Sequence, residues 1–216
     1  WAQRQGDDAF VRRATDENFR SRAAFKLTEI DDVYGLLRGK QLRVLDLGAA
    51  PGSWSQVALR RLAAGSTLVA VDLDPLEPLA APPGIAFHSV VGDVCEDATL
   101  ARVFKAFEGR KIHLVLSDLS PQFSGELDAD REEAAGLLQR AVTAAEGLLK
   151  KGGAMVVKCF QGDTERLSAA FLRAMFRSVE RVKPSASRQA SAEFFALCRG
   201  FKDTALWEAV RRNPAV

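Results

Sequence analysis

The fold of this chain is decided by the stretch Arg43-Val44-Leu45-Asp46-Leu47-Gly48-Ala49-Ala50-Pro51-Gly52-Ser53-Trp54. Its first five residues predict a buried strand, and a helix is expected to begin near Ser53. Between the two, Gly48 and Gly52 permit a close backbone approach and a positive φ, while Pro51 stiffens the turn. A strand, a glycine-rich loop and a helix in this order predict a ligand-binding loop at the carboxyl end of a parallel strand.

The alternation of strand and helix continues along the chain. Strands are predicted at Arg43–Leu47, Thr67–Asp72, Ala86–Val91, His113–Ser117, Ala154–Lys158, Ser178–Val182 and Phe194–Cys198, and helices at Trp54–Ala63, Asp97–Glu108, Arg131–Leu149 and Glu165–Phe176. This alternation predicts an α/β fold with a mostly parallel, seven-stranded sheet covered on both faces. Residues 183–193 carry no helical pattern, so we expect the last strand to run antiparallel.

The segment before the first strand has its own apolar pattern. Phe19, Ala23, Leu27, Ile30, Tyr34 and Leu37 fall at helical spacing and predict an amphipathic helix that docks on the sheet. Lys26 lies at the margin of this stripe, where it either directs its ammonium into a cleft or stays solvated. Because no linker or repeat interrupts the chain, we expect one domain over 1–216, with a helical extension over about 1–40 and a Rossmann-like core over about 41–201.

Composition limits the protein class. The chain has 216 residues, is 47% hydrophobic and has 27% charged residues, which suits one globular domain. Its three cysteines are far apart and predict neither a disulfide framework nor a zinc site, so we expect a reducing compartment and no metal. No apolar run is long enough to span a bilayer, so we expect a soluble protein with no membrane partner. Because the chain starts at Trp1, a cleaved organellar transit peptide is one alternative, and an artificially chosen start is another.

The net charge of +2 hides an uneven distribution. Residues 41–149 carry 9 cationic against 15 anionic side chains, whereas residues 150–216 carry 13 against 6. A basic last third beside an acidic middle predicts a polarised surface that attracts phosphate on one side. An ordinary solvated surface explains the same counts.

Acidic residues complete the predicted ligand site. The loop Gly48-Ala49-Ala50-Pro51-Gly52 matches neither the dinucleotide fingerprint nor a Walker loop. Asp72 closes the second strand, where it can accept both ribose hydroxyls, and Asp93 follows the third strand and can accept the adenine amino group. Together they predict S-adenosylmethionine as cofactor, with Trp54 packing on the adenosyl group or, alternatively, in the core. Each aspartate alone is also explained as a helix or turn cap.

Asp118 ends the fourth strand, Lys158 ends the fifth, and Glu193 begins the antiparallel last strand, so all three are predicted at one sheet edge. A lysine that ends an apolar strand needs a partner when it is buried. Methyl transfer to a hydroxyl requires a base beside the oxygen. Lys158 is the expected base in the fraction of molecules with a neutral amine, which burial and Lys26 favour and the two carboxylates oppose. The alternative is an ion-pair network that only stabilises the sheet edge.

Several motifs resemble the FtsJ/RrmJ-like ribosomal RNA 2′-O-ribose methyltransferases, a family with mitochondrial members. They are Arg20-Ser21-Arg22-Ala23-Ala24-Phe25-Lys26-Leu27, Asp46-Leu47-Gly48-Ala49-Ala50-Pro51-Gly52-Ser53-Trp54-Ser55-Gln56, Ser117-Asp118, Val156-Val157-Lys158-Cys159-Phe160-Gln161-Gly162, and Lys183-Pro184 through Ser187-Arg188 to Glu193. The resemblance runs from about Phe10 to Phe201. It implies a catalytic tetrad of Lys26, Asp118, Lys158 and Glu193, and cofactor contacts from Gly52, Trp54, Asp72, Asp93 and Asp118.

The resemblance also implies S-adenosylmethionine as methyl donor and a uridine ribose of large-subunit ribosomal RNA as acceptor. Where the family has Asp-Met-Ala-Pro-Asn this chain has Asp118-Leu119-Ser120-Pro121-Gln122, and Phe194-Phe195 replaces valine-tyrosine after the glutamate. We expect RNA phosphates to contact Arg12, Arg13, Arg20, Arg22, Arg181, Lys183 and Arg188. A monomer acting on a large-subunit particle, in the mitochondrial matrix or the bacterial cytoplasm, is expected.

Two other functions stay open. The protein could be a ribosome-assembly factor that binds RNA on a methyltransferase fold, with reduced or dispensable catalysis. A small-molecule O-methyltransferase is also compatible with the tetrad, although the basic last third argues against it. Cytosine-C5 methylation is disfavoured because the fourth strand ends without a cysteine, and adenine amino methylation because Asp118-Leu119-Ser120-Pro121 lacks the expected Pro-Pro-aromatic pattern.

Overall fold

A computed structural model describes residues 8–121, 124–162, 165–188 and 191–202. Seven strands form one sheet in the order β3-β2-β1-β4-β5-β7-β6. The strands are β1 (Arg43–Leu47), β2 (Thr67–Asp72), β3 (Ala86–Val91), β4 (Ile112–Ser117), β5 (Leu149–Phe160), β6 (Phe176–Val182) and β7 (Glu193–Phe201). Only β7 runs antiparallel to its neighbours β5 and β6. The predicted sheet, with its antiparallel last strand, is confirmed.

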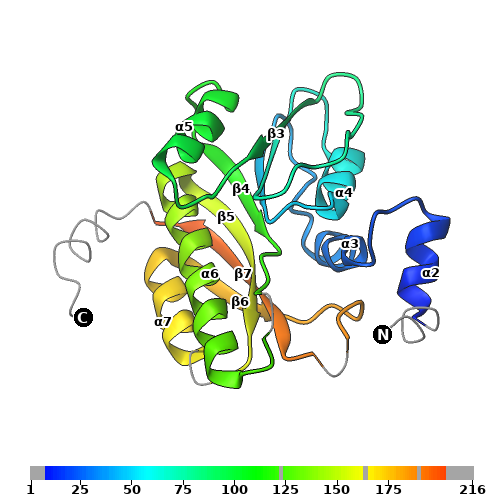
Figure 1. Cartoon of the computed structure of the whole chain (residues 1–216). Coiled ribbons are helices and arrows are strands. Elements are labelled where there is room, and N and C mark those ends of the chain that lie inside the picture. The colour runs from blue at the N-terminus through cyan, green and yellow to red at the C-terminus, as the bar shows by residue number, and fades with distance from the viewer. Residues whose placement is uncertain (1–7, 122–123, 163–164, 189–190, 203–216) are drawn as a thin grey trace.

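Helices cover both faces of the sheet (Figure 1). Helices α5 (Asp97–Ala106), α6 (Leu127–Leu148) and α7 (Glu165–Met175) lie on one face, and α3 (Ala23–Tyr34) and α4 (Ser53–Arg61) lie on the other. Because strand side chains alternate between faces, Val156 and Leu116 pack under α3 and α4, whereas Val157 and Val115 pack under the other helices. None of the helices in the described part could cross a membrane.

The apolar pattern of residues 19–37 predicts one helix, and that prediction is wrong at both ends. Helix α3 covers only Ala23–Tyr34 and ends where Gly35 adopts a φ of 64°, a conformation that glycine takes easily. Phe19 and Leu37 still pack on the helix because the flanking turns return them to the same apolar cluster. A further short helix, α2 (Ala9–Asp16), lies beyond α3 (Figure 1).

The end of α6 also differs from the prediction. Leu149 is predicted to end a helix, but it begins β5, which is therefore longer than the predicted Ala154–Lys158. Ile112 pairs with Leu149 and Leu114 pairs with Ala154, so extra residues of β5 bulge out between these two pairings. The sequence did not predict this longer strand, because the two glycines at residues 152–153 indicate a turn, and such a turn normally marks the start of a strand.

Helix α3 is fastened to the loop between β6 and β7 by a carboxylate. Glu29 accepts hydrogen bonds from the backbone N–H of Ser185 at 2.6 Å, the Ser185 hydroxyl at 2.8 Å and the N–H of Ala186 at 3.0 Å. Arg22, just before α3, donates to the carbonyl of Ala186 and pairs with Asp8. These contacts join the first elements of the chain to the loop that precedes Glu193.

Glu29→Ala should loosen this loop without unfolding the sheet. The substitution removes three hydrogen bonds to a charged acceptor, which predicts a loss of about 2 kcal/mol in the free energy of unfolding. Amide hydrogen exchange should accelerate at Ser185 and Ala186 and stay unchanged in β1 and β4. Glu29→Gln keeps one acceptor oxygen, so its exchange rates at Ser185 and Ala186 should fall between those of wild type and Glu29→Ala. Unchanged exchange at both amides in Glu29→Ala would contradict this account.

Candidate active site

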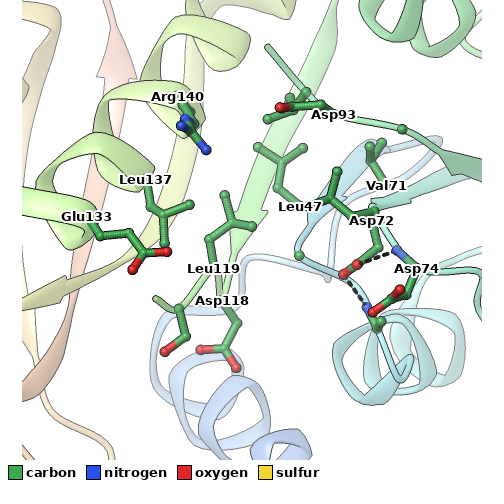
Figure 2. A pocket seen from close by; sticks show the side chains of 16 residues that line it. Leu47, Val71, Asp72, Asp74, Asp93, Asp118, Leu119, Glu133, Leu137 and Arg140 are labelled. Atoms are coloured by element: carbon green, nitrogen blue, oxygen red, sulfur yellow. Dashed lines mark hydrogen bonds between the residues drawn. The ribbon is translucent and has the colours of Figure 1, made fainter. Parts of the chain in front are cut away.

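A cavity of about 620 Å³ opens at the carboxyl edge of the sheet, and we call it the carboxyl-edge cavity. It lies where strand order reverses between β1 and β4, the position at which open α/β sheets bind ligands. Its walls come from the ends of β1, β2 and β4, the segment after β3, and α6 (Figure 2). The cavity has the size of a small-molecule site.

Asp72, at the end of β2, organises the glycine-rich loop. Its two carboxylate oxygens accept the backbone N–H groups of Ala50 at 2.8 Å and Asp74 at 3.0 Å (Figure 2). Gly48 has a φ of 70°, and a Cβ there would lie 2.7 Å from a methyl carbon of Leu119. Glycine is therefore required at this point of the loop. Each Asp72 oxygen retains a lone pair for a ligand hydroxyl.

The structure brings together most of the residues predicted to bind a cofactor. Those that line the cavity are Gly48, Ala50, Asp72, Asp93 and Asp118. Pro51 and Gly52 belong to the same loop but are not among its lining residues. Trp54 is buried in the core instead, where its indole N–H donates to the carbonyl of Ala23 at 2.9 Å and its ring centroid lies 5.5 Å from that of Phe195.

One wall of the cavity was missed by the sequence reasoning. Glu133, Leu137 and Arg140 project from α6 toward the acidic residues on the opposite side (Figure 2). They are four and three residues apart and so share one helix face. This helical spacing is the feature of the sequence from which the cavity wall could have been predicted. A mixed acidic, apolar and basic face does not distinguish a cavity wall from a solvated surface, so the pattern alone could not identify them.

Lys158 and Asp118 form a buried ion pair beside the cavity. The ammonium Nζ of Lys158 lies 2.7 Å from Asp118 Oδ1 and donates to the Asp118 carbonyl at 3.0 Å. The Lys158 side chain is only 6% exposed, so its charge needs this partner. Asp118 also lines the carboxyl-edge cavity. One carboxylate therefore joins the ligand cavity to the lysine.

Lys26 and Glu193 form a second ion pair, with 2.6 Å between Nζ and Oε1. Burial raises the pKa of Glu193, but the charges of Lys26 and Lys158 outweigh burial and hold the pKa below its usual value. Both pairs are on the α3 face of the sheet, since Lys158 faces Phe195 across the β5–β7 ladder and Glu193 is two residues from Phe195. The four residues predicted from scattered positions form one cluster.

The cationic residues expected to bind RNA occupy two neighbouring regions. Arg12 and Arg13 are exposed on α2, and Arg13 pairs with Glu17 at 2.6 Å. Arg181 stacks on Phe194, Lys183 donates to the carbonyl of Ser191, and Arg188 is exposed. Burial lowers the pKa of Arg22, Arg188 lowers it further and Glu193 opposes the change, which places Arg22 beside both charges. Arg22 and Arg188 therefore lie near Glu193, whereas Arg181 lies on the opposite face of the sheet, where Phe194 packs.

Arg20 is directed into the fold. Its guanidinium donates to the carbonyl of Pro51 at 2.6 Å and to that of Pro78 at 2.9 Å. A Cβ at Gly52, where φ is 112°, would lie 2.5 Å from Arg20 Nη1. Arg20 thus ties the glycine-rich loop to the segment after Asp72, a contact between residues far apart in sequence.

Asp46 is an acidic residue buried next to this edge of the sheet. It is fully buried on β1, and Oδ2 accepts a hydrogen bond from Ser55 at 2.7 Å while Oδ1 has no partner. The pKa of Asp46 is raised to about 7, mainly by burial and in addition by the charges of Asp118 and Asp72, while the Ser55 hydrogen bond opposes the rise. Within the described residues, no group of three or more acidic, histidine or cysteine side chains could hold a metal ion.

Asp46→Asn should change how stability depends on pH. Between pH 4 and 7 the folded wild-type protein keeps a proton on Asp46 that the unfolded chain has released, so raising the pH lowers the free energy of unfolding. The asparagine side chain does not titrate, so the variant should be more stable than wild type by about 4 kcal/mol at pH 8, with a smaller difference at pH 5. Urea denaturation of both proteins at the two pH values tests this. An equal difference at pH 5 and pH 8 would contradict the account.

Known proteins resemble this chain along most of its length. The model of the FtsJ-like methyltransferase family matches residues 19–201. "Ribosomal RNA large subunit methyltransferase E" of Leptothrix cholodnii is 41% identical over 212 residues, covering 92% of this chain and 89% of the relative. The protein of that name from Granulibacter bethesdensis is 40% identical over 206 residues, covering 95% and 86%.

Solved structures agree with this assignment. A Plasmodium falciparum protein assigned as a ribosomal RNA methyltransferase superimposes with a TM-score of 0.72 at 27% identity, covering 85% of this chain and 98% of that one. The family match includes both ion pairs and every strand of the sheet. This chain belongs to the FtsJ-like methyltransferase family.

Proposed function

We propose that this protein transfers a methyl group from S-adenosylmethionine to the 2′-hydroxyl of a uridine ribose in large-subunit ribosomal RNA. The observation that carries the proposal is the double role of Asp118, which lines the carboxyl-edge cavity and lies 2.7 Å from Lys158. The methyl donor in the cavity and the base Lys158 outside it would both lie next to the Asp118 side chain. The names of the bacterial relatives support ribosomal RNA as the acceptor.

The residues of the cavity suit an adenosyl ligand. Asp72 is fixed by two backbone N–H groups and can accept the two ribose hydroxyls, and Asp93, which also lines the cavity, would accept the adenine amino group. Gly48 keeps that side of the loop free of a side chain. The acidic walls also suit a ligand that carries ammonium and sulfonium charges. The bound cofactor would supply a methyl group on a positively charged sulfur that leaves as a neutral thioether.

Lys158 would act on the acceptor hydroxyl in its neutral form. Its amine takes the proton as the oxygen forms its bond to the methyl carbon, and the resulting ammonium is stabilised by the carboxylate of Asp118. Lys26 is held by Glu193 on the other side of the cluster, where its positive charge stabilises the negative charge that develops on the oxygen. Asp118 and Glu193 therefore position the two lysines.

RNA would approach on the α3 side. We propose that Arg12, Arg13, Lys183 and Arg188 contact phosphates around the cluster. Arg181 stacks on Phe194 on the opposite face of the sheet, so it is not placed for this approach. Arg20 and Arg22 already donate to backbone carbonyls, so we propose that they shape the loops that receive the cofactor and the RNA.

The stretch that departs from the family pattern after Asp118 lies beside the cavity. Ser120 lines the cavity and Pro121 is buried, whereas Gln122 is outside the described residues.

The cellular setting follows from the relatives. The two relatives with about 40% identity, from Leptothrix cholodnii and Granulibacter bethesdensis, are bacterial, so of the two compartments predicted we propose the bacterial cytoplasm. We further propose a monomer that acts on a large-subunit particle. The alternative, an assembly factor with dispensable catalysis, is favoured by one observation: Lys158 and Lys26 each already have a carboxylate partner, as a purely structural network requires.

Lys158→Ala should abolish turnover while leaving cofactor binding intact. Loss of a general base predicts at least a ~10²-fold fall in the rate of methyl transfer, and Lys26→Ala and Asp118→Ala should fall comparably. The measurement is tritium transfer from labelled S-adenosylmethionine to immature large subunits. Calorimetric binding of S-adenosylmethionine to Lys158→Ala serves as the folding control, because Lys158 is not a cavity-lining residue. Near-normal turnover would refute the mechanism, and full rescue of subunit assembly by Lys158→Ala would favour the assembly factor.

Arg20→Met should weaken the binding of S-adenosylmethionine in the absence of RNA. The variant loses two charged hydrogen bonds that hold Pro51 and Pro78, so we expect the Kd to rise about tenfold. Arg38→Met is the matched control, because Arg38 also donates to a backbone carbonyl but at the end of α3. If Arg20→Met binds the cofactor as tightly as wild type and loses only RNA affinity, Arg20 is an RNA contact instead.

A further inference from the structure

The edge of the sheet opposite the carboxyl-edge cavity is basic across five adjacent strands. We call this surface the amino-edge band and define it by Arg43, Arg110, Lys111, Lys150, Lys151, Arg177, Arg199 and Lys202. Strands β1, β4, β5 and β6 begin at this edge, and the antiparallel β7 ends there. Five strands at about 4.8 Å spacing make the band roughly 20 Å long.

Most of the band is open to solvent. Arg110, Lys111, Lys150, Lys151 and Arg177 are all exposed. Lys150 and Lys151 stand on the bulge of β5, and Gly152, with a φ of 81°, turns the chain back into the sheet. The bulge thus presents two neighbouring ammonium groups beyond the regular edge.

Contacts between neighbouring strands hold the cations together. Arg43 donates from Nε to the carbonyl of Lys111 at 2.7 Å, and its backbone N–H donates to His113 Nδ1 at 3.1 Å. Burial, together with the charges of Lys150 and Arg43, lowers the pKa of His113 to about 4. These three groups from β5, β1 and β4 are therefore close enough to affect one another.

Few anions oppose the band. Glu108 pairs with Arg110 and Glu180 pairs with Arg199, and Glu146 lies in the last turn of α6. Eight cations against three anions leave a positive surface, whereas the carboxyl edge carries Asp46, Asp72, Asp74, Asp93 and Asp118. The strand length of five to six residues separates the two edges by roughly 17–20 Å.

We propose that the amino-edge band is a second RNA-binding surface, which holds the phosphates of ribosomal RNA about 20 Å from the nucleotide that receives the methyl group. The inference rests on the proposed action on ribosomal RNA and adds where that RNA is held. A row of cations of this length fits a phosphate backbone. Among the described residues near the band, Phe104, beside Gly109, and Val33, next to Tyr34, are large exposed apolar side chains on two separate helices, and they form no continuous apolar face of the kind with which a membrane-surface helix binds lipid.

The test neutralises the outermost charges in Lys150→Gln/Lys151→Gln/Arg177→Gln. The Kd for a large-subunit ribosomal RNA fragment that accepts the methyl group should rise at least tenfold at low salt. The slope of log K against log salt should become shallower by about 2, because up to three phosphate contacts are lost. The turnover rate at saturating RNA and the Kd for S-adenosylmethionine should stay within twofold of wild type, since the band is remote from the cavity.

A matched variant, Lys150→Arg/Lys151→Arg/Arg177→Lys, keeps every charge and should bind RNA like wild type. Wild-type affinity and salt slope in the neutral variant would overturn the proposal, as would equal weakening in the charge-retaining variant, which indicates a structural defect. Binding of wild type to vesicles containing phosphatidylserine, lost in the neutral variant with RNA affinity unchanged, would also overturn it. If wild type transfers no methyl group to the RNA, the proposed function itself fails.

Discussion

A buried ammonium requires a carboxylate within hydrogen-bonding distance, and this constraint organises the functional edge of the protein. Lys158 lies two residues before the end of β5, in the middle of the sheet, and is held by Asp118, which directly follows the neighbouring strand β4. Removing either residue would leave the other as a buried charge without its ion-pair partner. Because Asp118 faces the carboxyl-edge cavity as well, the same pairing that stabilises the strand end places a lysine beside a ligand site.

Much of this arrangement could be predicted from sequence because it depends on strand ends. Parallel strands bring their carboxyl ends to one edge, so Asp72, Asp93 and Asp118 were expected together once the strands were recognised. The place of Lys26 in the cluster was harder to predict, since a lysine at the margin of an apolar helical stripe is usually solvated. It is buried because Glu193 lies opposite, a pairing that depends on how α3 docks on β7.

Other features depend on tertiary contacts that sequence patterns do not encode. Arg20 was predicted as an RNA contact because its charge is visible in the sequence and its carbonyl partners, Pro51 and Pro78, are not. Trp54 follows the glycine-rich loop, but the first turn of α4 rotates it into the core. The basic last third of the chain was visible as a count, whereas the meeting of Lys150, Lys151, Arg177, Arg199 and Lys202 with Arg43, Arg110 and Lys111 at one edge depends on the strand order and on the antiparallel direction of β7.

The carboxylate of Glu29 and the guanidinium of Arg22 join the start of the fold to residues 185–186, which a ribosome would synthesise more than 150 residues later. Lys26, in α3, likewise reaches its partner Glu193 only after β7 has been synthesised. A nascent chain can form β1, the glycine-rich loop and β2 early, yet it cannot complete the charged cluster until its last strand is inserted between β5 and β6. Incomplete chains released during translation would therefore lack the Lys26–Glu193 pair, even where β1, the glycine-rich loop and β2 have already folded.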